Sequence, residues 1–183
     1  DPTKADARGA TCIAVACVEG HLDVVRMLYR DKRADLQQPD HLGYAPLHRA
    51  IVSGHVEIAH YLLAKGVDVN RALAEDAPEA CGSGGCRIPR RDTALHLAVR
   101  QLSRAKKLVQ RPVRYDAFEL LLRYGADLSQ ADHNGDTPLH LMARQGDTMG
   151  LWLCLSLVPQ ASQHLAAVNG DGASVVQDAS ESG

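Results

Sequence analysis

The chain has 183 residues, of which 45% are hydrophobic, and its formal net charge at pH 7 is −2. This balance is typical of a folded soluble domain, and it excludes a disordered chain or a strongly basic protein that coats nucleic acid. No apolar run approaches the ~20 residues of a membrane span. Aromatic residues make up only 4% of the chain. The core is therefore predicted to consist of Leu, Val, Ile and Ala side chains on closely packed helices.

One short motif occurs four times along the chain. Its copies are Thr11-Cys12-Ile13-Ala14, Ala45-Pro46-Leu47-His48, Thr93-Ala94-Leu95-His96 and Thr137-Pro138-Leu139-His140. Gly20-His21, Gly54-His55 and Gly146-Asp147 follow three of the copies, and a fifth copy begins at Gly172. A motif that recurs along the chain in this way is the signature of a repeat protein.

The motif residues favour pairs of short helices. Thr137 can cap a helix at its N-terminus, and Pro138 fits the first turn, where a missing N–H costs nothing. Gly54 and Gly66 are predicted to end the two helices of the second copy in left-handed conformation. Each helix pair alone cannot bury its apolar face, so stacking of successive pairs completes the core.

These residues resemble the ankyrin repeat, whose signature is Thr-Pro-Leu-His followed by Gly-His and Gly-Ala-Asp. The resemblance covers nearly the whole chain and implies an all-α solenoid of about four to five stacked helix–turn–helix repeats with hairpin-like turns. We expect the repeats at about residues 6–38, 39–70, 88–130 and 131–160, with a partial repeat or cap at 161–183.

Two insertions interrupt the regular spacing. Leu47 and Leu95 are 48 residues apart, and Leu95 and Leu139 are 44 apart, against a nominal repeat of ~33. The first insertion is predicted to form a loop at 71–91, where Arg91 takes the usual glycine position and the turn must be rebuilt. The second, a basic segment at 100–114, is expected to extend the first helix of repeat three through Lys107 or beyond.

The last helix of repeat four is apolar on all sides. The run 151–158 is unlike a helix that faces solvent, so something is expected to cover it. The segment from Ala161 to Val168 and the partial repeat near Val175 are predicted to do so. No polar cap precedes repeat one, and the chain opens without Met, so we expect a longer parent protein.

The histidines and cysteines are assigned structural roles. The resemblance implies that His48, His96 and His140 hydrogen-bond neighbouring turns. Cys12, Cys17 and Cys154 are predicted to be small core residues. Cys81 and Cys86 are interpreted as free thiols in the loop, since zinc or a disulfide is the less favoured alternative without a second ligand pair. We predict no catalytic residue, metal or cofactor.

The predicted function is to bind another protein. The resemblance implies contact through the turn tips and the concave face of the first helices. Carried onto this sequence, it gives as candidates His41, Leu42, Tyr44, Val52, Ser53, Arg100, Gln101, His133, Asn134, Asp136, Arg144 and Gln145. Tyr44 is expected to be an exposed anchor.

The basic segment adds Arg104, Lys106 and Lys107 to these candidates. It is either a solvated helix face or a grip on an acidic partner surface. Nucleic acid is not expected, because no aromatic residues are interleaved with the charges. A membrane partner is not expected either, and the isolated chain is expected to be a monomer.

A second hypothesis makes the chain the recruiting arm of a larger enzyme. Its Arg-rich and Ala-rich composition fits a bacterial effector, and it shows a resemblance to the ankyrin tails of ADP-riboxanase effectors, which recruit host caspases. The expected location is the cytoplasm or, for an effector, the cytoplasm of the host cell. The full-length gene discriminates between the two hypotheses.

Overall fold

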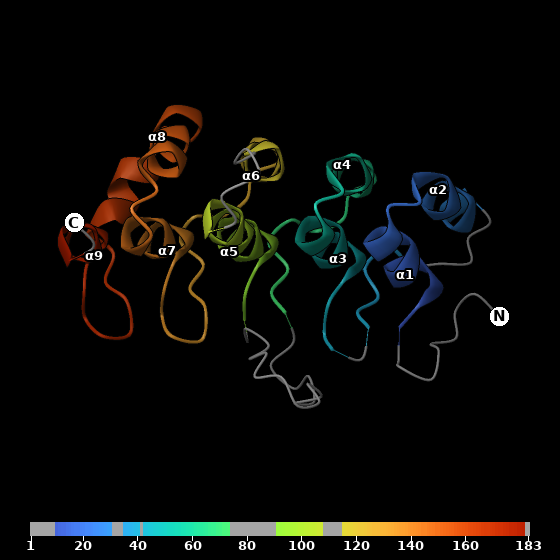
Figure 1. The fold of residues 1–183 in the computed structure, drawn as a ribbon, viewed down its shortest axis with the longest axis horizontal. Coiled ribbons are helices and arrows are strands. Elements are labelled where there is room, and N and C mark those ends of the chain that lie inside the picture. Colours follow the sequence, from blue (N-terminus) through green and yellow to red (C-terminus); the bar gives the residue numbers. More distant parts are fainter. Residues whose placement is uncertain (1–9, 31–34, 41, 74–90, 108–114, 182–183) are drawn as a thin grey trace. The chain divides into compact units, whose positions relative to one another are not determined.

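A computed structural model describes residues 10–30, 35–40, 42–73, 91–107 and 115–181, without the side chains of 103–107 and 181 (Figure 1). The chain forms two compact units, which divide between Ala94 and Leu95.

The first unit holds two helix pairs. They are α1 (Cys12–Glu19) with α2 (Leu22–Arg30), and α3 (Pro46–Ser53) with α4 (Val56–Ala64). The first helix of one pair, α1, packs against the first helix of the next, α3, while α2 contacts α4. Within this unit α2 and α4 lie on the side of α1 and α3 that faces away from the turn before α3 (Figure 1).

The second unit holds the remaining helices. They are α5 (Ala94–Lys107, whose first residue belongs to the first unit), α6 (Asp116–Arg123), α7 (Pro138–Arg144), α8 (Thr148–Leu157), the 3₁₀ turn η1 (Ala161–Ala166) and α9 (Val175–Glu181). Helix α7 packs against α8 and α9, and α6 packs against α8. The described residues contain no strand, only the isolated bridges Ala72–Thr93 and Val168–Ser174 at hairpin-like turns. The predicted all-α repeat architecture is confirmed.

The helix boundaries follow the predicted signals. Thr11 caps α1 by accepting a hydrogen bond from the Ala14 N–H. Pro46 and Pro138 begin α3 and α7. Gly54 ends α3 at φ 80°, in the left-handed region where a side chain is disfavoured. The extended first helix of repeat three is also confirmed, because α5 reaches Lys107.

The predicted rebuilding of the turn can be followed only from Arg91 onward, because residues 74–90 lie outside the described residues. Arg91 has φ 64° and is the one non-glycine residue with positive φ among the described residues. The glycines at the same place in other turns, Gly43 and Gly135, have φ 77° and 78°. Arg91 therefore has the left-handed conformation of these glycines. Leu73, at the edge of the predicted loop, is buried and donates to the Asp92 carbonyl.

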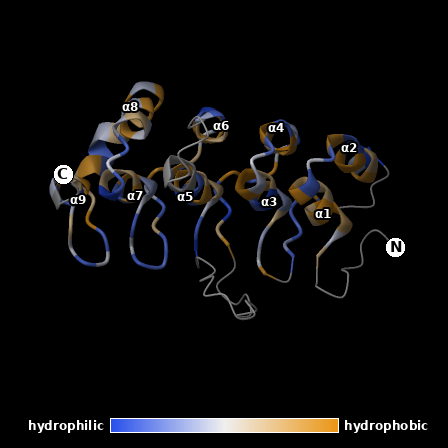
Figure 2. Ribbon diagram, in the orientation of Figure 1, coloured by the Kyte–Doolittle hydropathy of each residue, from blue (hydrophilic) through white to orange (hydrophobic). Residues whose placement is uncertain are grey.

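The core is made of aliphatic side chains at matching positions in the helix pairs. Leu47, Ile51 and Leu62 are at most 1% exposed in the first unit. Leu121 and Leu139 are fully buried in the second. Figure 2 shows hydrophobic residues gathered on the helices and hydrophilic ones on the turns.

Two of the three cysteines that were expected in the core are buried. Burial raises the pKa of the Cys17 and Cys154 thiols to about 12. Cys12 is exposed, so its prediction is wrong. The equivalent Pro46 of α3 is buried. Within the described residues no earlier helix packs in front of α1, and this leaves Cys12 in solvent. Cys81 and Cys86 lie outside the described residues.

The expected covering of the apolar helix α8 is only partial. Cys154 and Ala161 are completely buried, because α8 contacts α7 and η1. Trp152 on the same helix is 61% exposed, and Met149 is 54% exposed. The segment after α8 therefore seals one side of the helix and leaves the other in solvent, contrary to the prediction.

The motif histidines join consecutive turns, as predicted. His48 accepts the Ala45 N–H at Nδ1 (3.1 Å) and donates from Nε2 to the Arg71 carbonyl (2.9 Å). His140 accepts the Thr137 N–H at Nδ1 (3.3 Å) and donates from Nε2 to the Ala167 carbonyl (3.1 Å). These partners require a neutral ring with its proton on Nε2. Each ring thus ties the start of its own helix to a turn 23 or 27 residues further along the chain.

This geometry predicts that stability falls in acid. Burial lowers the pKa of His48 from 6.5 to about 4. Between these values the unfolded chain binds a proton that the folded chain excludes, so stability is complete above pH 6.5 and declines as pH falls towards 4. The expected loss is about 3 kcal/mol at most, at 1.36 kcal/mol per pKa unit. Urea unfolding at pH 7 and pH 4.5 measures it. His48→Gln should be less stable at pH 7 and show a smaller loss, whereas equal losses in both proteins would contradict the assignment.

The buried leucines predict the cost of core truncation in each unit. Leu62→Ala in the first unit and Leu121→Ala in the second remove side chains that are 0% exposed. Each should lower the free energy of unfolding by about 2–5 kcal/mol, because a cavity remains. Leu155→Ala is the matched control, since Leu155 is 46% exposed, and it should cost less than about 1 kcal/mol. Chemical denaturation at low protein concentration makes the comparison, and equal costs at buried and exposed sites would contradict this core.

Candidate partner-binding surface

Each described turn tip is shaped by one side chain at its start. Asp40 Oδ1 accepts the backbone N–H groups of Leu42 and Tyr44, both at 3.0 Å. Asp132 Oδ1 accepts those of Asn134 and Asp136, at 2.8 and 3.0 Å. A carboxylate that satisfies two backbone donors fixes the turn before any partner arrives.

Asn169 repeats this arrangement in the fifth turn. Its side-chain Oδ1 accepts the N–H groups of Asp171 and Ala173, each at 3.0 Å. Its Nδ2 donates to Asp136 Oδ1 at 3.0 Å. The amide therefore builds its own turn and also joins it to the preceding one.

An arginine from a first helix lies beside each of the two turn aspartates. In the first unit Arg49 Nε donates to Asp40 Oδ2 at 2.7 Å. In the second unit Arg100 Nη2 donates to Asp132 Oδ2 at 2.8 Å. The two aspartate side chains are 1% and 0% exposed, while the arginines keep 23% and 33% of theirs in solvent. The carboxylates are thus buried, and the guanidinium groups form the surface above them.

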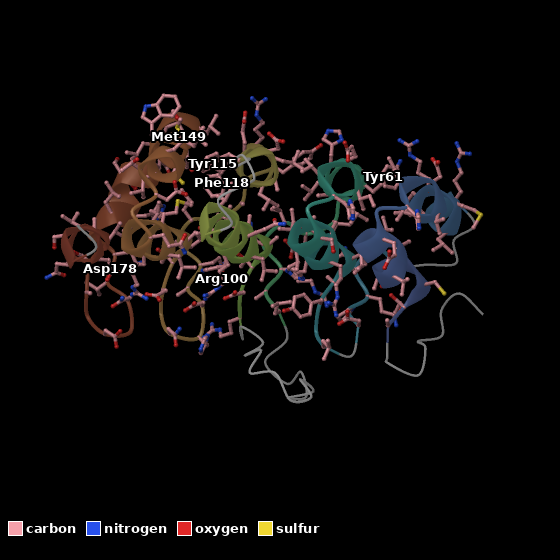
Figure 3. All side chains as sticks on the ribbon, viewed as in Figure 1. Tyr61, Arg100, Tyr115, Phe118, Met149 and Asp178 are labelled. Carbon is pink, nitrogen blue, oxygen red and sulfur yellow. The ribbon has the colours of Figure 1, made fainter. Side chains whose placement is uncertain are left out.

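Arg144 carries a larger version of the same arrangement. It donates to both oxygens of Asp136, at 2.9 and 3.0 Å, and to Asp178 on α9 at 3.3 Å. The hydrogen bonds to Asp136 raise the pKa of Arg144 further. Figure 3 labels Asp178 and Arg100 of this unit. The candidate Asp136 is only 2% exposed, and both of its carboxylate oxygens are bonded to Arg144.

Sequence reasoning missed these ion pairs. It also missed Asp178 and Asn169, which join α7 to the fifth turn and helix. Asp40, Asp132 and Asn169 share one place in the repeat, and that recurrence was the available signal. The arginines were harder to find, because they do not share one place in the repeat. Arg49 is the fourth residue of α3, whereas Arg144 is the seventh residue of α7.

The first helices of the first unit carry an apolar exposed face. Val15 and Val18 on α1 are 44% and 38% exposed, and Val52 on α3 is 36% exposed. Ser53 beside them is half-buried. The expectation that Tyr44 is an exposed anchor is not met, since Tyr44 is half-buried and the Arg49 guanidinium lies 4.3 Å from its ring centre.

In the second unit the corresponding face is polar. Arg144 is exposed, and Arg100, Gln101 and Gln145 are half-buried. At the turn tips His133 and Asn134 are exposed, whereas Leu42 in the first unit is half-buried. The candidates outside the described residues or side chains are His41, Arg104, Lys106 and Lys107.

The described residues contain no cluster of three or more metal-ligating side chains. None of the described helices combines the length and apolarity needed to cross a membrane.

One polar network away from the first helices is structural. Tyr115 donates to Asp147, which also accepts the Gly150 N–H at the start of α8. Burial, together with this bond, raises the pKa of the Tyr115 hydroxyl.

Comparison with known proteins identifies the repeats. Three family models of ankyrin repeats match residues 1–72, 47–105 and 90–133. The chain is 32% identical over 128 residues to the ankyrin repeat and KH domain-containing protein 1 of Homo sapiens, which covers 70% of this chain. It is 33% identical over 129 residues to the related protein mask of Drosophila melanogaster, again covering 70% of this chain. It is 30% identical over 143 residues to the target of rapamycin complex 2 subunit AVO2 of Saccharomyces cerevisiae, covering 72%.

These relatives are much longer than the matched region. The alignments span 4% and 3% of the first two proteins and 33% of the third. Ankyrin repeats are protein-interaction modules used in many otherwise different proteins. The helix pairs and the turn geometry agree with the matches to three ankyrin-repeat family models. The chain therefore belongs to the ankyrin-repeat family.

Proposed function

We propose that this chain is a non-enzymatic module that binds another protein through its first helices and turn tips. The observation that carries the proposal is the fixed frame beneath these positions. Asp40, Asp132 and Asn169 fix three turns through backbone hydrogen bonds. Side chains held on such a frame lose little conformational freedom on binding, which favours affinity.

The first unit offers a place for apolar groups of the partner. Val15, Val18 and Val52 leave 36–44% of their surface in solvent on two helices that pack together, α1 and α3. Valine side chains are stiff, so they present this surface at little entropic cost. We infer that an apolar side chain of the partner contacts this face.

The second unit offers hydrogen-bond donors. The side chains of Arg100 and Arg144 are 33% and 47% exposed. They are paired with carboxylate side chains that are at most 6% exposed. Gln101 and Gln145 are the next residues on the same helices. Donors at the surface with acceptors beneath them favour a partner rich in carboxylate or carbonyl oxygens. The basic residues Arg104, Lys106 and Lys107 would attract the same kind of partner.

The recruiting-arm hypothesis uses the same surface within a larger protein. It is kept as a second proposal because the matched repeats make up only 3–4% of the two animal relatives. Ankyrin repeats in those proteins accompany other segments of a long chain. A catalytic domain encoded in the same gene would support this proposal, and its absence would remove it.

The apolar face is tested by a matched pair of double variants. Val18→Gln with Val52→Gln changes residues that are 38% and 36% exposed on first helices. Val24→Gln with Met27→Gln changes residues that are 39% and 54% exposed on the second helix α2. A partner captured by affinity purification should dissociate at least tenfold faster from the first variant, because apolar packing that forms after encounter determines mainly the off-rate. The control should bind normally. The reverse result would place the binding face on the second helices.

The basic segment is tested by charge reversal. Arg104→Glu, Lys106→Glu and Lys107→Glu together should slow association of the captured partner and weaken its salt dependence, since electrostatic attraction acts on encounter. Arg30→Glu, Lys65→Glu and Arg123→Glu change the net charge equally at exposed positions elsewhere. Surface binding at low and high salt gives both association rates. Equal slowing in the two triple variants would mean that net charge acts, and not this segment.

A further inference from the structure

Two of the three asparagines in the chain are followed by glycine. Asn134-Gly135 and Asn169-Gly170 lie in the turns before α7 and α9, whereas Asn70 precedes an arginine. An asparagine side chain loses ammonia when the backbone nitrogen of the next residue attacks its amide carbon. Glycine favours this attack, because no side chain hinders the nitrogen and the backbone reaches conformations closed to other residues. Both turns therefore contain the local chemistry for deamidation.

The fold holds the amide of Asn169 in place. Asn169 is only 7% exposed. Its Oδ1 accepts the N–H groups of Asp171 and Ala173, and its Nδ2 donates to Asp136 Oδ1. The amide carbon can turn towards the Gly170 nitrogen only after these three hydrogen bonds break. Opening of a buried, bonded segment is rare in a folded protein, so this asparagine is protected.

Asn134 stands in the opposite environment. It is exposed at the tip of the turn before α7, and the hydrogen bonds that it makes among the described residues come from its main chain. The attacking nitrogen of Gly135 donates to the Asp132 carbonyl at 3.0 Å. One turn hydrogen bond must therefore open before the nitrogen can attack. Exposed turns open far more often than buried networks.

We propose that Asn134 is a site of spontaneous deamidation and that the fold protects Asn169. The Gly135 nitrogen gives its proton to hydroxide and forms a bond to Cγ of Asn134. The Cγ–Nδ2 bond then breaks and ammonia leaves, which closes a succinimide ring. Addition of water at Cγ restores the main chain and leaves an aspartate. Addition at the main-chain carbonyl carbon breaks the original peptide bond and leaves isoaspartate, whose chain runs through Cβ and Cγ.

The isoaspartate product does not fit this turn. The Gly170 N–H donates to the Asn134 carbonyl at 3.1 Å, so the turns before α7 and α9 lie side by side (Figure 1). A Cβ atom on Gly135 would clash with the Gly170 backbone nitrogen. Isoaspartate adds a methylene group to the main chain at this crowded place and removes the accepting carbonyl from it. This product should separate the two turns, whereas the aspartate product should leave them together.

Either product also changes the proposed binding surface, because Asn134 is one of its turn-tip residues. A negative charge is added at the tip, and its effect on a partner is a consequence that rests on the proposed function. The deamidation itself does not, since it needs only water and the folded chain. Failure of one proposal is therefore distinguishable from failure of the other.

Peptide mapping tests the site. The full chain is incubated at about pH 8 and about 37 °C, and each asparagine is followed by mass spectrometry for the gain of about 1 Da that replaces an amide NH₂ with OH. Trypsin separates the two sites by cleaving after Arg144. We expect Asn134 to convert at least about tenfold faster than Asn169 in the folded chain, and the two to convert at similar rates in guanidinium chloride, where the turns are lost.

Two results would overturn the proposal. One is equal conversion of Asn134 and Asn169 in the folded chain. The other is a folded Asn134 that stays intact while it converts in guanidinium chloride. Asn134→Gln is the matched control, because glutamine must close a larger ring and should leave the mass of this peptide unchanged. A gain of mass that persists in this variant would place the reaction at another residue and would also overturn the proposal.

Hydrogen exchange at the Gly170 amide tests the separation of the turns. Asn134→Asp supplies the aspartate product alone, and aged protein enriched in isoaspartate is identified by isoaspartate-specific enzymatic methylation. We expect exchange at Gly170 to stay near that of the parent chain in Asn134→Asp and to rise at least about tenfold in the isoaspartate protein, because the accepting carbonyl has moved. Equal exchange in the three proteins would contradict the separation of the turns.

Discussion

The hydrogen bond from a motif histidine to the carbonyl of a later turn is the interaction on which each unit depends. His48 and His140 each hold the start of their own helix through Nδ1 and a distant turn through Nε2. His96 donates to the Asp136 carbonyl in the same way. A helix pair alone buries too little apolar surface to be stable, so it needs such a bond to set the register of its neighbour. The cost is a buried imidazole that must stay neutral.

The turn aspartates extend this frame to the surface. Asp40 and Asp132 satisfy backbone donors with one oxygen and an arginine with the other. Because the acid is buried and the base is exposed, one ion pair both stabilises the turn and presents a cation to solvent. Arg144 does so for two acids from different turns and helices. In the proposed binding surface the arginines would therefore serve both turn stability and partner contact, whereas Val18 and Val52 expose apolar surface on the helices.

Two exposed apolar surfaces have different origins. The valines of α1 and α3 lie on first helices. Trp152 and Met149 lie on a second helix that is apolar all round and that the following η1 turn seals on one side only. The first surface belongs to the proposed partner-binding site, whereas the second is the side of α8 that η1 leaves exposed.

The sequence by itself determined the repeat architecture. Thr-Pro-Leu-His motifs, left-handed glycines and the extended first helix of repeat three are local signals, and the structure agrees at Pro46, Gly54 and α5. Only the tertiary structure decided which side chains are free to bind. Asp136 and Tyr44 resembled surface residues because they sit in turns, yet contacts with Arg144 and Arg49 bury or engage them. Burial depends on residues distant in the chain, so no local pattern could have revealed it, and the same holds for the uncovered side of α8.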